Sequence, residues 1–158
     1  MNFEFENQWI LQSEQTRQEV IDFWNTHKLL KPDVSAIERA KEVVWVVRTP
    51  SKSIIGVSTA FKAHFKQLHN NFYVFRCAIA PDFRIPGLLA KILVDTRDFL
   101  ESIHKNDPDP CVGILTFVEN QGVNANRRAV WPASKMVYIG STANGKQIRV
   151  YYFKGARI

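Results

Sequence analysis

A turn that could hold an anion lies at residues 80–93, "APDFRIPGLLAKIL". Arg84 stands three residues before Gly87, and an apolar pattern typical of a helix begins at Leu88. The first amides of a helix have no intrahelical acceptor and carry partial positive charge, so such a turn can bind a phosphate. A Pro-Gly pair before a helix is equally ordinary turn chemistry without a ligand, and the turn alone leaves both interpretations open.

Histidines and cysteines are the other side chains that could do chemistry near neutral pH. His64 and His69 flank a turn between two strand-like runs. Either could act as a general base, although isolated histidines on a polar loop are more often surface residues. Cys77 and Cys111 lie in apolar, strand-like surroundings without metal-ligand spacing. We therefore expect buried free thiols and no metal site.

The composition is that of an ordinary globular domain. The chain has 158 residues, of which 46% are hydrophobic and 23% charged, so we expect one domain over residues 1–158. No apolar run is long enough to span a bilayer, and the acidic start lacks the features of a signal peptide. A cytoplasmic protein without a membrane partner is expected. The net charge of +6 favours anionic partners, although the basic residues are spread along the chain and such an excess is most often a solvated surface.

The elements that would position the turn alternate between helix and strand patterns. The first third predicts a short strand at residues 8–12 and two helices at 16–30 and 35–43. Thr16 with Glu19, and Ser35 with Glu38, have the spacing of capping boxes at these helices. Three β-rich runs at 42–49, 53–65 and 71–80 then predict an antiparallel meander that leads directly into the turn.

The remainder begins with a strong amphipathic helix from Leu88 to Ile103. An apolar strand follows at 111–120, then a short helix at 124–135. Two further strands surround Asn144-Gly145, a dipeptide typical of tight hairpins. The predicted order is β-αα-βββ-α-β-α-ββ, which belongs to the α/β (α+β) class.

This order, with a phosphate-type turn before the long helix, resembles the GNAT acyltransferase fold. The family signature places a strand and a Pro before Arg/Gln-x-x-Gly-x-Gly/Ala at a helix start. Here Pro81, Phe83, Arg84 and Gly87 match, while Leu89 replaces the usual small residue. The resemblance implies a mixed, mostly antiparallel central sheet flanked by helices, and it covers nearly the whole chain in element order.

A second match lies between the fifth and sixth predicted strands. GNAT proteins often have Asn-x-x-Ala-x-x-Leu-Tyr-x-Lys-x-Gly-Phe there. The residues that match are Asn126, Ala129, Lys135 and Tyr138. The residues that depart from it are Pro132, Ala133 and Val137, which replace Leu, Tyr and Gly.

The resemblance implies acetyl-coenzyme A, or another acyl-coenzyme A, as cosubstrate. In the family, amides of the turn bind the pyrophosphate and the preceding strand pairs with the pantetheine arm. Pro86 has no N–H, so this turn has one donor fewer than usual. The implied cofactor-binding residues are Cys77, Ala78, Ile79, Arg84, Ile85, Gly87, Leu88, Leu89, Ala90 and Asn126.

The implied activity is direct N-acyl transfer to a primary amine. Ala133 stands where many members carry the tyrosine that protonates the leaving thiolate, so the general acid is atypical or missing. Ser134 is a weak candidate for this acid, and Tyr138 is a second; solvation of Ser134 and packing of Tyr138 are the alternatives. Glu119, at the end of the predicted strand 111–120, is the candidate base, with an exposed strand-end glutamate as the alternative.

Two other functions compete with acyl transfer. The first is a non-catalytic GNAT-fold module that binds coenzyme A or a protein, which the departures at Pro86, Leu89 and Ala133 favour. Nucleic-acid binding ranks last; the basic C-terminal residues and the aromatic run "VYYFKG" motivate it. The expected partner is a small-molecule or peptide amine, and a homodimer is compatible with the family.

Overall fold

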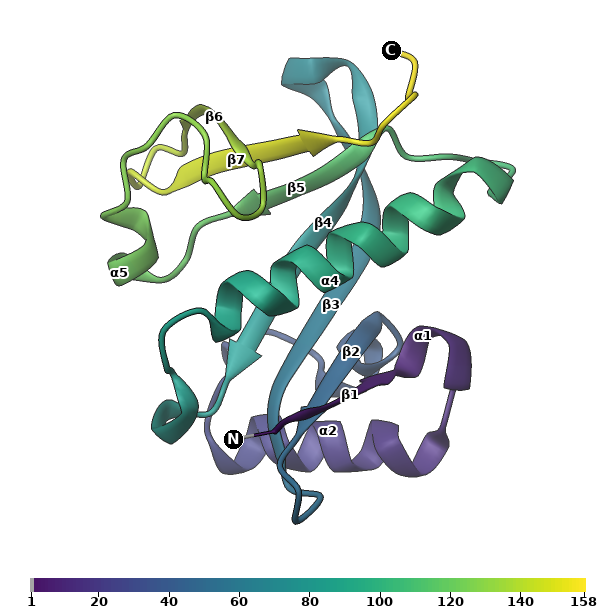
Figure 1. Ribbon diagram of the computed structural model, residues 1–158, viewed down its shortest axis with the longest axis vertical. Helices are drawn as coiled ribbons and strands as arrows, with labels where there is room; N and C mark the ends of the chain where they lie inside the picture. Colours follow the sequence, from purple (N-terminus) through teal and green to yellow (C-terminus); the bar gives the residue numbers. More distant parts are fainter. Residues whose placement is uncertain (1) are drawn as a thin grey trace. The chain divides into compact units, whose positions relative to one another are not determined.

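The computed structural model describes residues 2–158 (Figure 1). The elements follow in the order β1 (Glu4–Asn7), α1 (Gln8–Leu11), α2 (Glu14–Thr26), α3 (Ala36–Ala40), β2 (Val43–Arg48), β3 (Ile54–Phe65), η1 (Lys66–Leu68), β4 (Asn70–Ile79), η2 (Pro81–Phe83), α4 (Leu88–Ile103), η3 (His104–Asn106), β5 (Gly113–Phe117), α5 (Gln121–Asn124), β6 (Val137–Ser141) and β7 (Gln147–Tyr152), where η marks a short 3-10 helix.

The strands form one seven-stranded sheet in the order β1-β2-β3-β4-β5-β7-β6. The β4–β5 ladder is parallel, and the β1–β2, β2–β3, β5–β7 and β6–β7 ladders are antiparallel. This confirms the predicted fold class, with α1 as an additional short helix. Among the described helices, none is long and apolar enough to cross a membrane.

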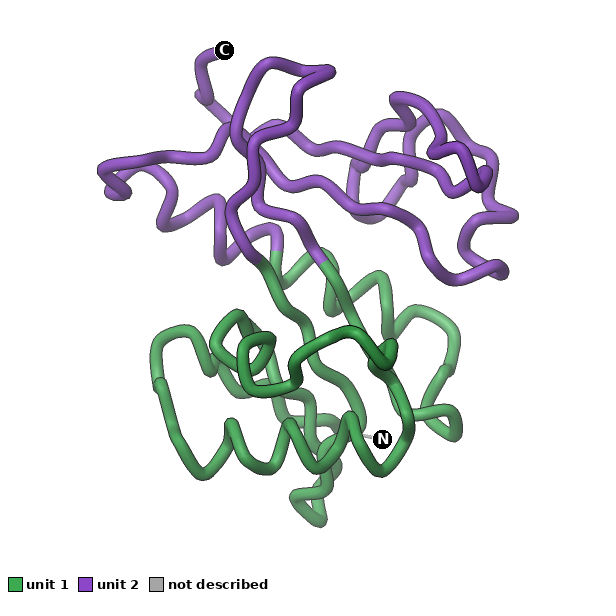
Figure 2. The backbone as a smooth tube through the Cα atoms, turned by 180° about the vertical axis from the view of Figure 1, so that it is seen from behind, with its two compact units in different colours: residues 1–60, 76–96 green, residues 61–75, 97–158 purple. Residues whose placement is uncertain are grey.

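The chain divides into two compact units, which Figure 2 colours separately. Unit 1 contains residues 2–60 and 76–96, and unit 2 contains residues 61–75 and 97–158. Strands β3 and β4 and helix α4 each contribute residues to both units. The expectation of a single domain over residues 1–158 stays a prediction.

Unit 1 buries apolar side chains on both faces of its strands. One cluster joins α2 and α3 to β2 and β3 and contains Val20, Phe23, Trp24, Ala40, Val43, Val46, Val57 and Ala80. The other joins the first turns of α4 to the opposite face and contains Val47, Ile55, Ile79, Leu88 and Ile92. Each helix therefore buries an apolar stripe against the sheet, the arrangement that the 3.6-residue periodicity of α4 predicts.

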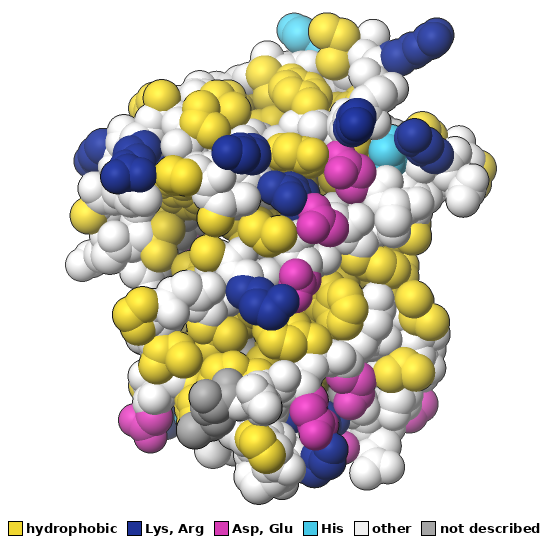
Figure 3. All heavy atoms as spheres, in the orientation of Figure 1, with side chains coloured by type: hydrophobic (Ala, Val, Ile, Leu, Met, Phe, Trp, Pro, Cys, Tyr) yellow, Lys and Arg dark blue, Asp and Glu magenta, His cyan; other side chains and the backbone are white. Residues whose placement is uncertain are grey.

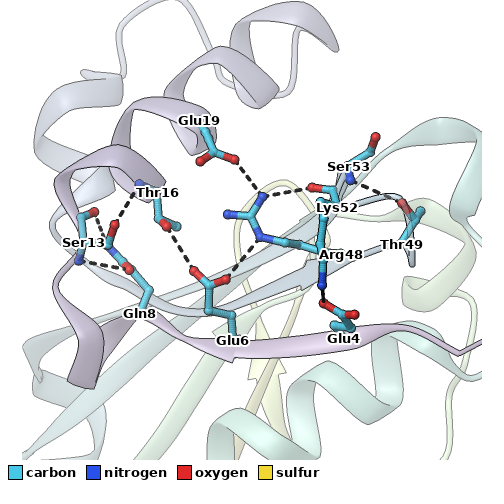
Figure 4. Close-up of polar contacts among 10 residues, drawn as sticks. All are labelled: Glu4, Glu6, Gln8, Ser13, Thr16, Glu19, Arg48, Thr49, Lys52 and Ser53. Atoms are coloured by element: carbon cyan, nitrogen blue, oxygen red, sulfur yellow. Dashed lines mark hydrogen bonds and ion pairs between the residues drawn. The ribbon is translucent and has the colours of Figure 1, made fainter.

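A buried arginine connects β1, α2 and β2 in unit 1 (Figure 4). The Arg48 Nε donates to Glu6 Oε2 at 3.2 Å, and its Nη1 donates to Glu19 Oε2 at 2.7 Å. The Thr16 hydroxyl donates to the other oxygen of Glu6 at 3.0 Å. Two carboxylates thus balance this guanidinium, as a buried charge requires.

Unit 2 is built around β7, which pairs with β5 on one side and β6 on the other. Its core contains Phe72, Val74, Val112, Leu115, Ile148 and Val150. The approach of β5 to β7 requires a glycine, because a Cβ on Gly113 would lie 2.1 Å from the Tyr151 carbonyl oxygen. The hairpin predicted at Asn144-Gly145 is confirmed: Gly145 has a φ of +80° and its amide donates to the Thr142 carbonyl at 2.9 Å.

The N-terminal elements begin earlier than predicted. A strand at 8–12 is wrong, because Asn7 caps a helix there by accepting a hydrogen bond from the Ile10 amide at 3.1 Å. Strand β1 lies before this cap. The cap of α2 is Ser13 rather than Thr16, whose amide donates to the Ser13 hydroxyl at 3.1 Å. The cap predicted at Ser35 is confirmed.

The helix predicted over 124–135 does not form. α5 ends where it was expected to begin, and the chain continues as a loop to β6. The carbonyls of Asn126 and Ala129 accept hydrogen bonds from Arg149 at 3.2 and 3.3 Å instead of from amides of a following helical turn. Pro132 supplies no amide for such a turn. A tertiary contact therefore replaces the local helix.

Candidate functional site

The first part of the candidate site is the turn between β4 and α4 in unit 1. Gly87 has a φ of +83°, a left-handed conformation that favours glycine, and open space surrounds the position of its absent Cβ. The Lys91 amide donates to the Gly87 carbonyl at 3.0 Å, which closes the first turn of α4. Within residues 2–158, the amides of Gly87, Leu89 and Ala90 have no backbone acceptor. These amides give the turn the donors that an anion needs.

Two of the predicted donors are already engaged. The Ile85 amide donates to the Phe83 carbonyl at 2.8 Å, and the Leu88 amide makes a longer bond of 3.4 Å to the Ile85 carbonyl. The half-buried Leu89 side chain packs against the core cluster formed with α4. Leu89 therefore contributes its amide to the turn while its side chain belongs to the core.

The same turn also carries a cation. The exposed Arg84 donates from Nε to the carbonyl of Ile79, the last residue of β4, at 3.3 Å. This bond ties the guanidinium to the strand end. An arginine in the same turn as the free helix amides adds a full positive charge to the partial charge of the helix terminus.

The end of β4 supplies the remaining predicted cofactor residues of unit 1. Cys77 and Ala78 are half-buried and Ile79 is buried. All three lie beyond Phe72–Val74, the part of β4 that pairs with β5. Burial raises the pKa of the Cys77 thiol to about 12, so this side chain is not a thiolate nucleophile at neutral pH.

In unit 2, Glu119 follows β5 and lies at the surface. Its Oε2 accepts a hydrogen bond from Lys146 Nζ at 2.8 Å. Lys146 belongs to the hairpin before β7, so the pair connects the end of β5 with that hairpin. The contact places a cation directly against the carboxylate proposed as the base.

Asn126 and Ser134 lie in the loop between α5 and β6. The Asn126 carbonyl accepts hydrogen bonds from Gln147 Nε2 and Arg149 Nη2, each at 3.2 Å. Ser134 is only 2% exposed, so the solvated alternative for its hydroxyl is wrong. That hydroxyl accepts from the Met136 amide at 3.3 Å. The structure therefore gives Ser134 a loop-closing contact, and its role as an acid stays a prediction.

The buried polar pair Gln147 and Arg149 was missed by the sequence-based assignment. Both side chains are completely buried, and Arg149 Nε donates to Gln147 Oε1 at 2.8 Å. The available signal was the alternation in "QIRVYY", which places Gln147, Arg149 and Tyr151 on one face of a strand. Polar residues at every second position of a buried strand indicate that backbone polar groups cover that face of the strand.

No protein-family model and no curated protein sequence matches the chain. Solved structures do resemble it. A GNAT-family acetyltransferase from Streptococcus pneumoniae is 11% identical with a TM-score of 0.65, over 97% of this chain and 100% of that one. A spermidine N-acetyltransferase from Vibrio cholerae in complex with CoA and spermine is 13% identical with a TM-score of 0.58, over 94% and 92%. AtaT complexed with acetyl-methionyl-tRNAfMet is 14% identical with a TM-score of 0.57, over 96% and 95%.

Proposed function

On the premise that the chain is a divergent example of the GNAT fold, we propose that it is an acetyl-coenzyme A-dependent N-acyltransferase acting on a primary amine. The observation that carries this proposal is the turn before α4. This turn carries three free amides, at Gly87, Leu89 and Ala90, and the Arg84 guanidinium, which is bonded to the end of β4. The proposed cofactor-binding residues are Cys77, Ala78, Ile79, Arg84, Ile85, Gly87, Leu88, Leu89, Ala90 and Asn126.

The solved structures support this choice of cosubstrate and acceptor. One was determined with CoA and spermine, and another contains an acetylated aminoacyl-tRNA. Both ligand sets belong to acetylation of an amine. We propose the same reaction class for this chain.

The proposed chemistry is direct transfer. A C–N bond forms between the amine and the acyl carbon, the C–S bond of the thioester breaks, and the thiolate is protonated. Glu119, which is paired with Lys146, takes the proton of the amine directly or through water. Ser134 is the weak candidate for the acid that protonates the thiolate. Positioning of the two substrates supplies much of the acceleration even with an atypical or missing acid.

A non-catalytic coenzyme A-binding module is the second candidate. Ala133 replaces the usual tyrosine, and the Ser134 hydroxyl is engaged with the Met136 amide. Only the first observation removes a proton donor from the loop, because the Ser134 oxygen accepts in that bond and keeps its own proton. This candidate predicts binding of acetyl-coenzyme A without release of free thiol in the presence of amines.

Titration calorimetry with acetyl-coenzyme A tests the proposal. The wild type is expected to bind one equivalent, and Gly87→Trp is expected to abolish binding because the indole fills the space over the turn. Gly155→Trp is the matched control, since Gly155 has a φ of +80° and equally open surroundings far along the chain. Equal binding by all three proteins, with native circular dichroism, would contradict the placement of the cofactor at this turn.

A further inference from the structure

The whole excess of positive charge lies in unit 2. This unit contains eleven Lys and Arg residues and five Asp and Glu residues, whereas unit 1 contains ten of each. The asymmetry is sharpest after Glu119, because residues 120–158 include seven Lys and Arg and no acidic residue. The net charge of +6 that looked dispersed along the sequence is therefore a property of one unit.

The loop from residue 125 to 138, here called the basic loop, presents three of these cations. Arg127, Arg128 and Lys135 are exposed. None of the three forms an ion pair with another residue in 2–158. In Figure 3, the coloured side chains over the α5 and β6 region are basic or hydrophobic, and the acidic ones lie elsewhere on that face. Nothing described in the basic loop neutralises these charges.

A buried framework holds the basic loop in one shape. Arg149 donates to the carbonyls of Asn126, Ala129 and Met136 at 3.2, 3.3 and 3.4 Å. Its guanidinium also stacks on Trp131, 4.2 Å from the ring centroid. The carbonyl oxygens of the loop are thereby turned inward, and the side chains of its arginines are left outward. A rigid loop loses little conformational entropy when it binds a partner.

Exposed apolar and aromatic side chains lie in the same segment as the cations. Tyr138 is 43% exposed; its hydroxyl lies 3.0 Å from Ser141 Oγ, and the Arg149 Cζ lies 5.9 Å from its ring centroid. Val130 and Val137 are exposed to a similar extent. Unpaired cations and a partly exposed aromatic ring in one segment suit single-stranded nucleic acid, because phosphates can meet the cations and a base can stack on the ring.

We propose that the basic loop is a docking surface for single-stranded RNA. The cations of Arg127, Arg128 and Lys135 contact phosphates, and Tyr138 offers a face on which a base stacks. One part of this inference rests on the proposed function, namely that the amine acceptor is carried on the RNA. The docking itself needs no acyl donor, so the two claims can fail separately.

The test uses the full chain and a fluorescein-labelled single-stranded RNA of about 20 nucleotides, followed by fluorescence anisotropy at several KCl concentrations. The loop variant is Arg127→Gln/Arg128→Gln/Lys135→Asn. The matched control is Lys66→Gln/Lys105→Gln/Lys28→Asn, which removes the same charge from exposed residues elsewhere. Lys28 and Lys135 both have positive φ, 52° and 62°, so the two Asn substitutions meet the same backbone conformation.

The wild type is expected to bind the RNA with micromolar affinity at low salt, and the loop variant at least about tenfold more weakly. The slope of log K against log salt should fall by about 2, since three phosphate contacts are lost. The control should stay close to the wild type. Tyr138→Leu, which keeps an apolar side chain, should weaken binding about fivefold without changing the salt slope.

Three results would overturn the docking surface. The first is equal loss of RNA affinity in the loop variant and the control. The second is a parallel loss of acetyl-coenzyme A affinity in the loop variant, which would assign the cations to cofactor phosphates. The third is tighter binding to phosphatidylserine vesicles than to RNA. The chain could also bind RNA through the basic loop and yet fail to bind acetyl-coenzyme A. That result would support the docking surface and would overturn only the proposed function and the RNA-borne amine acceptor.

Discussion

The guanidinium of Arg149 lies over the ring of Trp131, with its Cζ 4.2 Å from the ring centroid, and no carboxylate within residues 2–158 is paired with it. Burial lowers the pKa of Arg149 from its ordinary value. An arginine remains protonated even so, because its ordinary pKa lies far above neutrality. The loop between α5 and β6 is thus folded around a buried cation whose partners are carbonyl oxygens and an aromatic face.

Replacement of this cation should destabilise the chain. Arg149→Met removes the donors to Asn126, Ala129 and Met136 and leaves their carbonyls without this partner. We expect the free energy of unfolding to fall by about 3 kcal/mol or more, measured by urea denaturation. Arg157→Met, at an exposed position, is the control and should change it by less than about 0.5 kcal/mol. Equal stability of the two variants would show that the buried guanidinium is not what holds the loop.

The assignment of Glu119 as base predicts a specific kinetic change. Glu119→Gln keeps the size of the side chain but cannot take a proton, so kcat should fall by about tenfold or more. The affinity for acetyl-coenzyme A, measured by calorimetry, should stay unchanged. Glu38→Gln is the matched control, because Glu38 is also an exposed carboxylate paired with a lysine. Turnover equal to that of the control would clear Glu119 of a catalytic role.

The two thiols should be unreactive in the folded chain. Burial raises the pKa of Cys77 to about 12 and that of Cys111 to about 11. An unfolded cysteine has a pKa near about 8.5, so folding favours the neutral thiol. The resulting stability is fully present below that value and is lost as pH rises toward 11 and 12.

Iodoacetamide labelling at about pH 8 should therefore modify neither cysteine in the native chain and both after denaturation. The Cys77→Ala/Cys111→Ser variant should lose less stability than the wild type when the melting temperature is followed from about pH 9 upward. Rapid labelling of Cys77 in the native chain would contradict the raised pKa of its thiol.

The sequence alone predicted the helices and strands whose apolar periodicity reflects their packing against one another. The meander β2–β4, the helix α4 and the β6–β7 hairpin all follow from periodicity and from turn residues such as Asn144-Gly145. The turn at Gly87 was also predicted correctly. Its φ of +83° favours glycine, and a glycine before a helix pattern can be read directly from the sequence.

The sequence failed where a distant side chain decides the local structure. Residues 124–135 contain a plausible helix pattern, yet Arg149 competes for the carbonyls that such a helix would use. Ser134 could not be recognised as buried for the same reason, since the loop that encloses it is fixed from β7 and by Arg97, whose Nη1 donates to the Ser134 carbonyl at 2.6 Å. The basic excess after Glu119 was visible in the sequence, whereas the balance of ten basic and ten acidic residues in unit 1 depends on how the chain divides in space.

The central claim is that the free amides of the turn before α4 bind the phosphates of acetyl-coenzyme A. Nitrogen-15 chemical shifts of the full chain, followed during titration with acetyl-coenzyme A, test it residue by residue. We expect Gly87, Leu89 and Ala90 to show the largest amide shifts and to saturate together. Saturable binding that leaves these three amides unmoved, or no binding at millimolar cofactor, would contradict it.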